Sequence, residues 1–261
     1  MRILITFAVE AEFAPWRRMH EFRKEELLSG GHAQGASAVY RTQVGNVYLD
    51  VGFTGIGWSG VNQGLDHLLS KEPDVWISSG LAGALRDSLQ LGDVVAPLAV
   101  LSRTGAEPPT NRFEVDKELR QLAVNTGAKA AECLLTTCRV LTLAVEKRAQ
   151  GSAAELVDME SFDAIREARK RGSRGVIIRA ISDSADEDLP IDFNDTLSRS
   201  RQVSLPRVLL RLAKNPLAMP RLIRFGKQSR KAAQSLALFL DSYVLQIAQL
   251  PSSYGREKVA V

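Results

Sequence analysis

Gly175-Val-Ile-Ile-Arg-Ala-Ile-Ser-Asp-Ser-Ala-Asp186 is the stretch that decides how this chain is interpreted. Its run Val176–Ile178 is apolar and β-branched, which predicts a strand buried on both faces of a sheet. The run is followed by Arg179, Ser182 and Asp183, polar groups that a core cannot hold unpaired. Open α/β sheets bind ligands beyond the carboxyl ends of their strands, so this strand end is a candidate site. A buried strand followed by an Asp-rich turn without function also fits the stretch alone.

Strands and helices alternate along the chain before this stretch. The sequence predicts strands at residues 2–8, 40–43, 47–53, 74–79, 91–101, 131–137 and 155–159, and helices at 10–19, 60–70, 116–125, 145–150 and 160–171. Such alternation predicts a sheet covered by helices on both faces. The small residues at 80–84 are expected to form a turn that a ligand can approach closely. Pro97 predicts a bulge or a sheet edge.

Charge is divided unevenly along the chain. Residues 1–195 carry 22 basic and 28 acidic side chains, whereas residues 196–240 carry ten basic side chains and no acidic one. We therefore expect a domain at 1–195 and a basic helical extension at 196–261, with apolar helical stripes at 205–212 and 236–247. The extension would suit an anionic membrane, an oligomer contact or a cover for the sheet. Nucleic acid is not an expected partner, because aromatic residues are hardly interleaved with the basic ones.

Other features of the sequence predict a cytoplasmic protein. The apolar residues 3–9 are interrupted at once by Glu10 and Glu12, which indicates a strand and not a signal peptide. No run reaches membrane-spanning length. Cys133 and Cys138 are expected on opposite faces of one strand, which disfavours a disulfide or a metal pair.

Three carboxylates stand at the ends of predicted strands: Glu12, Glu160 and Asp183. Each alone also fits a helix cap or a surface ion pair. Together with Arg179 and Ser182, they supply what cleavage of a glycosidic bond needs, namely an acid for the leaving group, a base for water and negative charge around a cationic transition state. None of the three histidines lies near a serine or cysteine in a nucleophile motif, and no metal-binding cluster is apparent, so neither chemistry is expected.

Four motifs in this order resemble the nucleoside phosphorylase superfamily, and within it the methylthioadenosine/S-adenosylhomocysteine nucleosidases. The motifs are Ala8-Val-Glu-Ala-Glu12, Ser79-Gly-Leu-Ala-Gly-Ala-Leu85 with Gly92-Asp-Val-Val95, Val157-Asp-Met-Glu-Ser161 and Arg179-Ala-Ile-Ser-Asp-Ser-Ala-Asp186. The resemblance spans residues 1–195. It implies a three-layer αβα fold with a mixed central sheet, and a homodimeric nucleosidase that acts on a small nucleoside without cofactor or metal.

The resemblance also implies catalytic roles for matching residues. Glu12 would activate the attacking water, which Arg179 would help to position. Glu160 would bind a ribose hydroxyl, and Asp183 would give a proton to the purine as it departs. This chemistry requires Asp183 to have a raised pKa, while Glu12 stays ionised.

The substrate-binding residues that the resemblance implies include several departures from the family. Met159 would pack on the sugar and Ser182 would help to hold the base, in a site also formed by Gly80, Leu81, Val140 and Leu141. Ser78 and Leu81 stand where the phosphorylases have a phosphate-binding arginine and a hydroxyl residue, which favours hydrolysis over phosphorolysis. Val140 stands where the nucleosidases have an aromatic residue that stacks on the purine. A purine nucleoside phosphorylase and a non-catalytic nucleoside-binding or membrane-associated module therefore stay open as alternatives.

The basic extension resembles the hopanoid-associated branch of the family, which is thought to release adenine from adenosylhopane. This similarity rests on residues 203–232, with Pro206, Pro216 and Pro220 between Arg- and Leu-rich turns, and on the form of residues 158–161. Amphipathic helices that carry arginines can lie on an anionic bilayer. The resemblance thus implies a lipid-linked substrate and peripheral contact with the inner face of the membrane.

Overall fold

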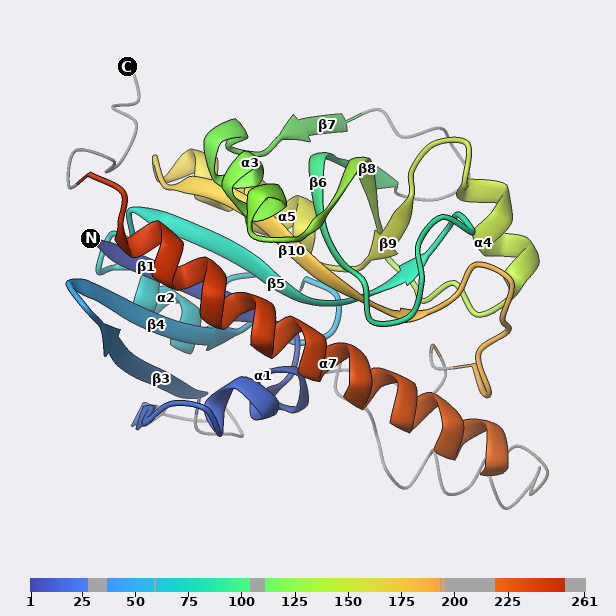
Figure 1. The fold of residues 1–261 in the computed structure, drawn as a ribbon, viewed down its shortest axis with the longest axis horizontal. Helices are drawn as coiled ribbons and strands as arrows, with labels where there is room; N and C mark the ends of the chain where they lie inside the picture. The colour runs from blue at the N-terminus through green and yellow to red at the C-terminus, as the bar shows by residue number, and fades with distance from the viewer. Residues whose placement is uncertain (28–36, 59, 104–110, 193, 195–218, 252–261) are drawn as a thin grey trace.

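The computed structural model describes residues 1–27, 37–58, 60–103, 111–192, 194 and 219–251 (Figure 1). Ten strands form one sheet: β1 (Arg2–Phe7), β2 (Arg23–Leu27), β3 (Ser37–Val44), β4 (Val47–Phe53), β5 (Val75–Ala84), β6 (Val94–Arg103), β7 (Asn111–Glu114), β8 (Lys129–Thr137), β9 (Leu156–Asp158) and β10 (Arg174–Asp183). The helices are α1 (Glu10–Arg17), α2 (Gln63–Leu69), α3 (Lys117–Asn125), α4 (Ala144–Gln150), α5 (Ser161–Lys170) and α7 (Met219–Ala248).

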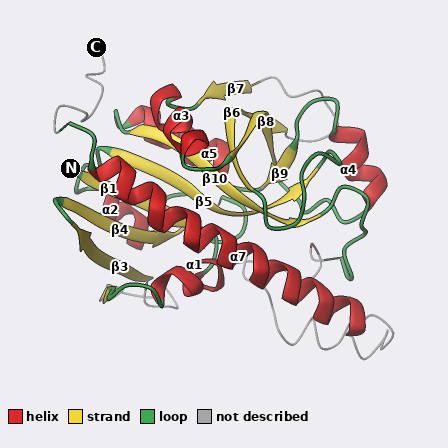
Figure 2. Cartoon of the chain, viewed as in Figure 1, coloured by secondary structure: helices red, strands yellow, loops and turns green. Residues whose placement is uncertain are grey.

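Helices cover both faces of this sheet, as Figure 2 shows. Alternate residues of β1 separate the two layers, because successive side chains of a strand point to opposite faces. Ile3 and Ile5 pack in one hydrophobic cluster with residues of α1, α3 and α7, whereas Leu4 packs in another with residues of α2 and α5. The sheet contains parallel pairs, such as β1 with β5, and antiparallel pairs, such as β3 with β4. The predicted three-layer αβα fold with a mixed sheet is confirmed.

Part of the sheet closes on itself, which the sequence did not predict. Strand β10 pairs with β5 on one side and with β6 on the other, and β6, β8, β9 and β5 pair in succession. Five strands therefore form a closed ring, from which β1, β4, β3 and β2 continue as an open sheet. Pro97 lies between the part of β6 that pairs with β10 and the part that pairs with β7, so the strand changes partner at the proline.

The small residues at 80–84 do not form the predicted turn. They continue β5, because β10 pairs with them from Gly80 to Gly83 and β9 pairs with Gly83 and Ala84. Glycine at position 80 permits this path, since its φ is +142°, which side chains rarely allow. The charged strands β2 and β7 were also missed, because neither has an apolar face in its sequence.

The helix α7 crosses one face of the sheet, and its first turns extend beyond it (Figure 1). Its buried residues include Leu236, Leu240 and Ile247, which pack in one cluster with residues of β1 and β10. The apolar stripe predicted at 236–247 is thereby confirmed as a sheet-facing surface, and the stripe predicted at 205–212 lies outside the described residues. Within the described part of the chain, no helix combines the length and the apolar character needed to span a bilayer.

Candidate active site

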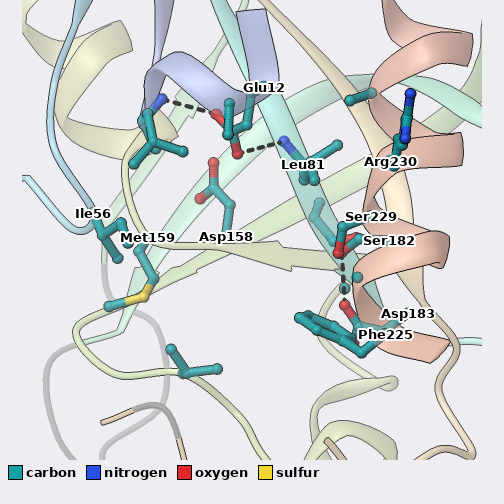
Figure 3. Close-up of a pocket in the computed structure, with 18 of the residues that line it drawn as sticks. Glu12, Ile56, Leu81, Asp158, Met159, Ser182, Asp183, Phe225, Ser229 and Arg230 are labelled. Carbon is teal, nitrogen blue, oxygen red and sulfur yellow. Dashed lines mark hydrogen bonds between the residues drawn. The ribbon is translucent and has the colours of Figure 1, made fainter. Parts of the chain in front are cut away.

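A cavity of about 610 Å³ lies between the strand ends and α7. The end of β1 and the start of α1 form one wall, while β5, β10 and the segment after β9 form its floor (Figure 3). The α7 residues Phe225, Ser229 and Arg230 line the cavity from the other side. The cavity thus brings together residues that are far apart in the chain, including the predicted Glu12, Leu81, Val140, Met159, Glu160, Ser182 and Asp183.

Glu12 lies in the first turn of α1, and two main-chain N–H groups from outside this helix hold its carboxylate. Its Oε2 accepts a hydrogen bond from the N–H of Ala8 at 3.0 Å, and its Oε1 accepts one from the N–H of Leu81 at 3.3 Å. Burial raises the pKa of Glu12 above its ordinary value, and the positive charge of Arg179 offsets part of that rise. The chemistry expected from the sequence requires Glu12 to stay ionised, and its loss of hydration acts against that form.

Gly80 does not line the cavity but lies directly beneath Glu12. A Cβ at this position would stand 2.3 Å from Nη1 of Arg179 and 2.9 Å from Oε2 of Glu12. Together with its φ of +142°, these contacts leave no room for a side chain. Glycine therefore allows the arginine and the glutamate to approach the backbone of β5.

Arg179 is enclosed behind the cavity, with 1% of its surface exposed. Its Nη2 forms an ion pair with Oδ2 of Asp158 at 2.6 Å and donates a hydrogen bond to Oγ of Ser161 at 2.9 Å, while Nη1 donates to the carbonyl of Ser79 at 2.8 Å. Its nearest approach to Glu160 is 3.8 Å. The guanidinium is thus committed to protein groups, and a buried charge needs such partners.

Glu160 stands between β9 and α5 and is almost fully buried. Its Oε1 accepts a hydrogen bond from the N–H of Gly57 at 2.6 Å. Burial and the nearby negative charge of Asp158 raise the pKa of Glu160 to about 8, although Arg179 and the N–H of Gly57 act in the opposite direction. These effects favour the protonated form of this side chain. Met159 lines the same part of the cavity beside Ile56 (Figure 3).

Both carboxylate oxygens of Asp183 are held by the protein. Oδ1 accepts a hydrogen bond from the hydroxyl of Ser182 at 2.7 Å, and Oδ2 accepts one from Nζ of Lys147 at 2.5 Å. Lys147 is a fully buried residue of α4 that the sequence analysis did not identify. No sequence signal could have found it, because a single lysine in a short helix usually faces solvent.

Val140 and Leu141 differ in position. Val140 lines the cavity, and the side-chain amide of Asn194 bridges its main chain: the N–H of Val140 donates to Oδ1 at 2.8 Å, and Nδ2 donates to the carbonyl at 3.0 Å. Leu141 packs instead into a hydrophobic cluster with Leu135 and Val157 behind the cavity. Leu141 would therefore support the residues that pack around it and would not contact the substrate.

Metal ligands and disulfides are not part of this site. No group of three His, Cys, Asp or Glu side chains in the described part of the chain could hold a metal ion. Cys133 and Cys138 are both free.

Comparison with known proteins identifies the family of this fold. The family model of the phosphorylase superfamily matches residues 2–214. A 5′-methylthioadenosine/S-adenosylhomocysteine nucleosidase of Geobacillus kaustophilus is 28% identical over 239 residues, which cover 82% of this chain and 97% of the relative.

Solved structures from Helicobacter pylori share the fold. A 5′-methylthioadenosine/S-adenosylhomocysteine nucleosidase in complex with a pyrrolidine ligand aligns with a TM-score of 0.71 and 19% identity, over 94% of this chain and 98% of its own. A futalosine hydrolase mutant aligns with a TM-score of 0.70 and 18% identity, over 94% of this chain and 99% of its own. The match of the family model over most of the chain confirms the expected family: the chain belongs to the phosphorylase superfamily.

Proposed function

We propose that this protein is an N-ribosyl hydrolase that releases adenine from a 5′-substituted adenosine. One observation carries the proposal: Glu12, Met159, Glu160 and Asp183 all line one cavity. Glu12 and Asp183 lie on different sides of it (Figure 3). A ribose between two carboxyl groups can lose its base on one side while water attacks on the other. The names of the similar nucleosidases and hydrolase support the same reaction class.

In the proposed reaction, the carboxylate of Glu12 takes a proton from water, whose oxygen bonds to C1′ of the ribose. The bond from C1′ to the purine breaks, and its electron pair stays with the base. Asp183 gives its proton to a ring nitrogen of that base, and Ser182 holds the carboxyl in place. Glu160 binds a ribose hydroxyl and Met159 packs on the sugar. Arg179 does not line the cavity, so we infer that it helps to fix the position of the water through its charge interaction with Glu12.

The main chain of Val140 supports adenine as the base. Its N–H and carbonyl already bind an amide oxygen and an amide N–H of Asn194. Adenine carries the same pattern on one edge, a ring-nitrogen acceptor beside an amino donor. We infer that adenine takes the place of the Asn194 amide when the substrate binds.

Hydrolysis is favoured over phosphorolysis by the charges around Glu12. Arg179, the cation that acts on this carboxylate, is committed to Asp158. Phosphate beside the carboxylate of Glu12 would meet repulsion from that negative charge. A purine nucleoside phosphorylase is the second candidate, and a strict requirement for phosphate would establish it.

The lining of the cavity supports a 5′ substituent that is largely apolar. Pro15 of α1 and Phe225 and Ala233 of α7 are among the lining residues, as are Arg18 and Arg230. Methylthioadenosine and adenosylhopane would use the apolar walls, and the carboxylate of S-adenosylhomocysteine would suit the arginines. We infer an adenosine with an apolar 5′ group, with adenosylhopane as the proposed lipid-linked case.

The first turns of α7 support membrane contact. Met219 and Ile223 are exposed there, beside the basic residues Arg221, Arg224 and Lys227. Such a helix can bury apolar side chains in an anionic bilayer while its cations remain among the headgroups. We infer a catalytic domain at 1–195 whose basic extension, 196–261, lies against the inner face of the membrane, in a cytoplasmic homodimer.

Release of free base by purified protein tests the enzymatic proposal. Methylthioadenosine, S-adenosylhomocysteine, a lipid-linked adenosine and inosine are compared with and without phosphate. We expect phosphate-independent release of adenine, lost in Glu12→Gln and Asp183→Asn variants that keep the fold by circular dichroism. Unchanged rates in both variants would contradict the mechanism, and no base release from any substrate would favour a non-catalytic module.

Sedimentation with vesicles and light scattering test the remaining proposals. Binding to vesicles that contain an anionic lipid should weaken at higher salt, because exposed charges are screened. A variant with Met219→Glu and Ile223→Glu should bind less. No sedimentation with anionic vesicles at low salt would remove the membrane proposal, and a monomeric mass would remove the homodimer.

A further inference from the structure

Lys147 is a buried cation that the proposed reaction does not yet use. Its side chain has no solvent exposure, and its Nζ donates to Oδ2 of Asp183 at 2.5 Å, to the carbonyl of Ser184 at 3.0 Å and to that of Glu187 at 2.9 Å. These acceptors account for all three N–H groups of an ammonium. A buried charge is costly to desolvate, and these three acceptors offset that cost. The contact between Lys147 and Asp183 is therefore part of the protein interior and differs from a solvent-exposed ion pair.

Lys147 does not line the cavity, whereas Asp183 and Ser182 do, so we assign it no direct contact with the substrate. Its three acceptors lie at the end of β10 and in the segment that follows, so the ammonium ties α4 to the part of the chain that carries Asp183. Ser182 holds the other carboxylate oxygen at 2.7 Å. The plane of the carboxyl group is therefore fixed from both sides.

We propose that Lys147 is a positioning residue that acts on the leaving base through Asp183. The inference rests on the proposed function, in which the O–H bond of Asp183 breaks, an N–H bond forms on the purine and the C1′–N bond breaks. That proton transfer leaves a negative charge on Asp183. Nζ of Lys147 stands 2.5 Å from the oxygen that shares this charge. The ammonium thus stabilises the carboxylate as it forms, and an interaction that strengthens during the reaction accelerates it.

Lys147 also fixes the orientation of the carboxyl group. A carboxyl group that can rotate presents its proton to the purine only part of the time, whereas one held by Lys147 and Ser182 presents it in one orientation. Loss of Lys147 should therefore lower kcat and leave KM almost unchanged. It should also matter only when the leaving group needs a proton.

The test compares two leaving groups in four proteins: wild type, Lys147→Met, Asp183→Asn and the double variant. The substrates are methylthioadenosine, whose base needs a proton, and 4-nitrophenyl riboside, whose nitrophenolate leaves without one. We expect Lys147→Met to lower kcat for methylthioadenosine by about 100-fold and to change the rate for the nitrophenyl riboside less than about threefold. The double variant should be no slower than Asp183→Asn alone, because both changes remove the same function.

Arg148→Met is the matched control. Arg148 is the next residue of α4, is exposed and pairs only with Asp87 among the described residues, so both rates should stay at the wild-type level. Circular dichroism checks that each variant folds, and Lys147→Gln replaces Lys147→Met if the latter does not.

Three results would overturn the inference: equal losses on both substrates, full activity of Lys147→Met on methylthioadenosine, or a double variant slower by the product of the single effects. If wild type releases adenine but not nitrophenolate, the inference is tested only by whether the double variant is slower than Asp183→Asn on methylthioadenosine. If wild type cleaves neither substrate, the proposed function fails instead.

Discussion

Replacing Glu160 by glutamine should change how the stability of this protein depends on pH. In the folded protein the pKa of Glu160 is raised from 4.5 to about 8, first by burial and then by Asp158. The unfolded chain loses this proton near pH 4.5, whereas the folded protein keeps it until about pH 8. Between these values the unfolded state binds fewer protons, so the free energy of unfolding falls as pH rises. The contribution of Glu160 to the free energy of unfolding is therefore complete below pH 4.5 and is lost as pH rises through 8.

The size of this effect follows from the shift. A difference of one pKa unit corresponds to about 1.4 kcal/mol, so a rise from 4.5 to about 8 amounts to about 5 kcal/mol across the whole interval. About 3 kcal/mol of this is lost by pH 7. A glutamine at this position would keep an oxygen that can accept from the N–H of Gly57, but it cannot ionise. The variant should lack this part of the pH dependence and should become the more stable protein at high pH.

Urea unfolding at several values between about pH 4.5 and 9, followed by fluorescence of Trp16, Trp58 and Trp76, measures the difference. Wild type and Glu160→Gln share all other titrating groups, so the difference between their unfolding free energies reports Glu160 together with its interactions with neighbouring charges. It should move steadily in favour of the variant as pH rises. A difference that stays constant within about 0.5 kcal/mol would refute the argument from burial.

Glu146→Gln provides a control of opposite sign. The hydrogen bond from Arg139 lowers the pKa of Glu146 in the folded protein, helped by the N–H groups of Leu143 and Thr142. This carboxylate therefore adds stability above its unfolded pKa, and the contribution is lost as pH falls through the folded value. Glu146→Gln should be less stable than wild type at neutral pH and should approach it in acid.

Three further predictions concern catalysis. Because burial raises the pKa of Glu12, kcat/KM should fall in acid with a midpoint above 4.5, and activity that is level down to that pH in folded protein would contradict this. Gly80→Ala should lower kcat about 100-fold by displacing Glu12 and Arg179. Gly127→Ala is the control, because Gly127 also has a positive φ but open space around it, and this variant should leave steady-state activity unchanged. Asn194→Ala should lower KM about tenfold with kcat unchanged, because two hydrogen bonds no longer compete with adenine; an unchanged KM would show that the amide is no competitor.

The sequence predicted the parts of the site that depend on strand ends. Glu12 follows β1, Glu160 follows β9 and Asp183 ends β10, so the order of strands and polar residues was enough to bring them to one place. The three-layer fold followed from alternation in the same way. These features could be predicted because they depend on the local pattern of apolar and polar residues, which can be seen in the sequence.

The missed features depend on tertiary contacts. Lys147 reaches Asp183 only because α4 packs against the end of β10, and Phe225 lines the cavity only because α7 crosses the sheet. Strand β2 is held by its pairing with β3 although its residues are mostly charged, and β5 continues through Gly80 because β10 pairs with it there. In each case the environment overrides a weak or contrary local preference.

The burial of Glu12 acts in two directions in the proposed reaction. Without substrate, desolvation raises the pKa of Glu12, which opposes the ionised form that a general base needs. In the proposed reaction, positive charge develops on the ribose and favours that ionised form. The same burial strengthens this attraction, because charges are screened less where water is displaced. The desolvation that opposes the ionised form of Glu12 in the empty cavity can therefore favour the reaction once substrate is bound.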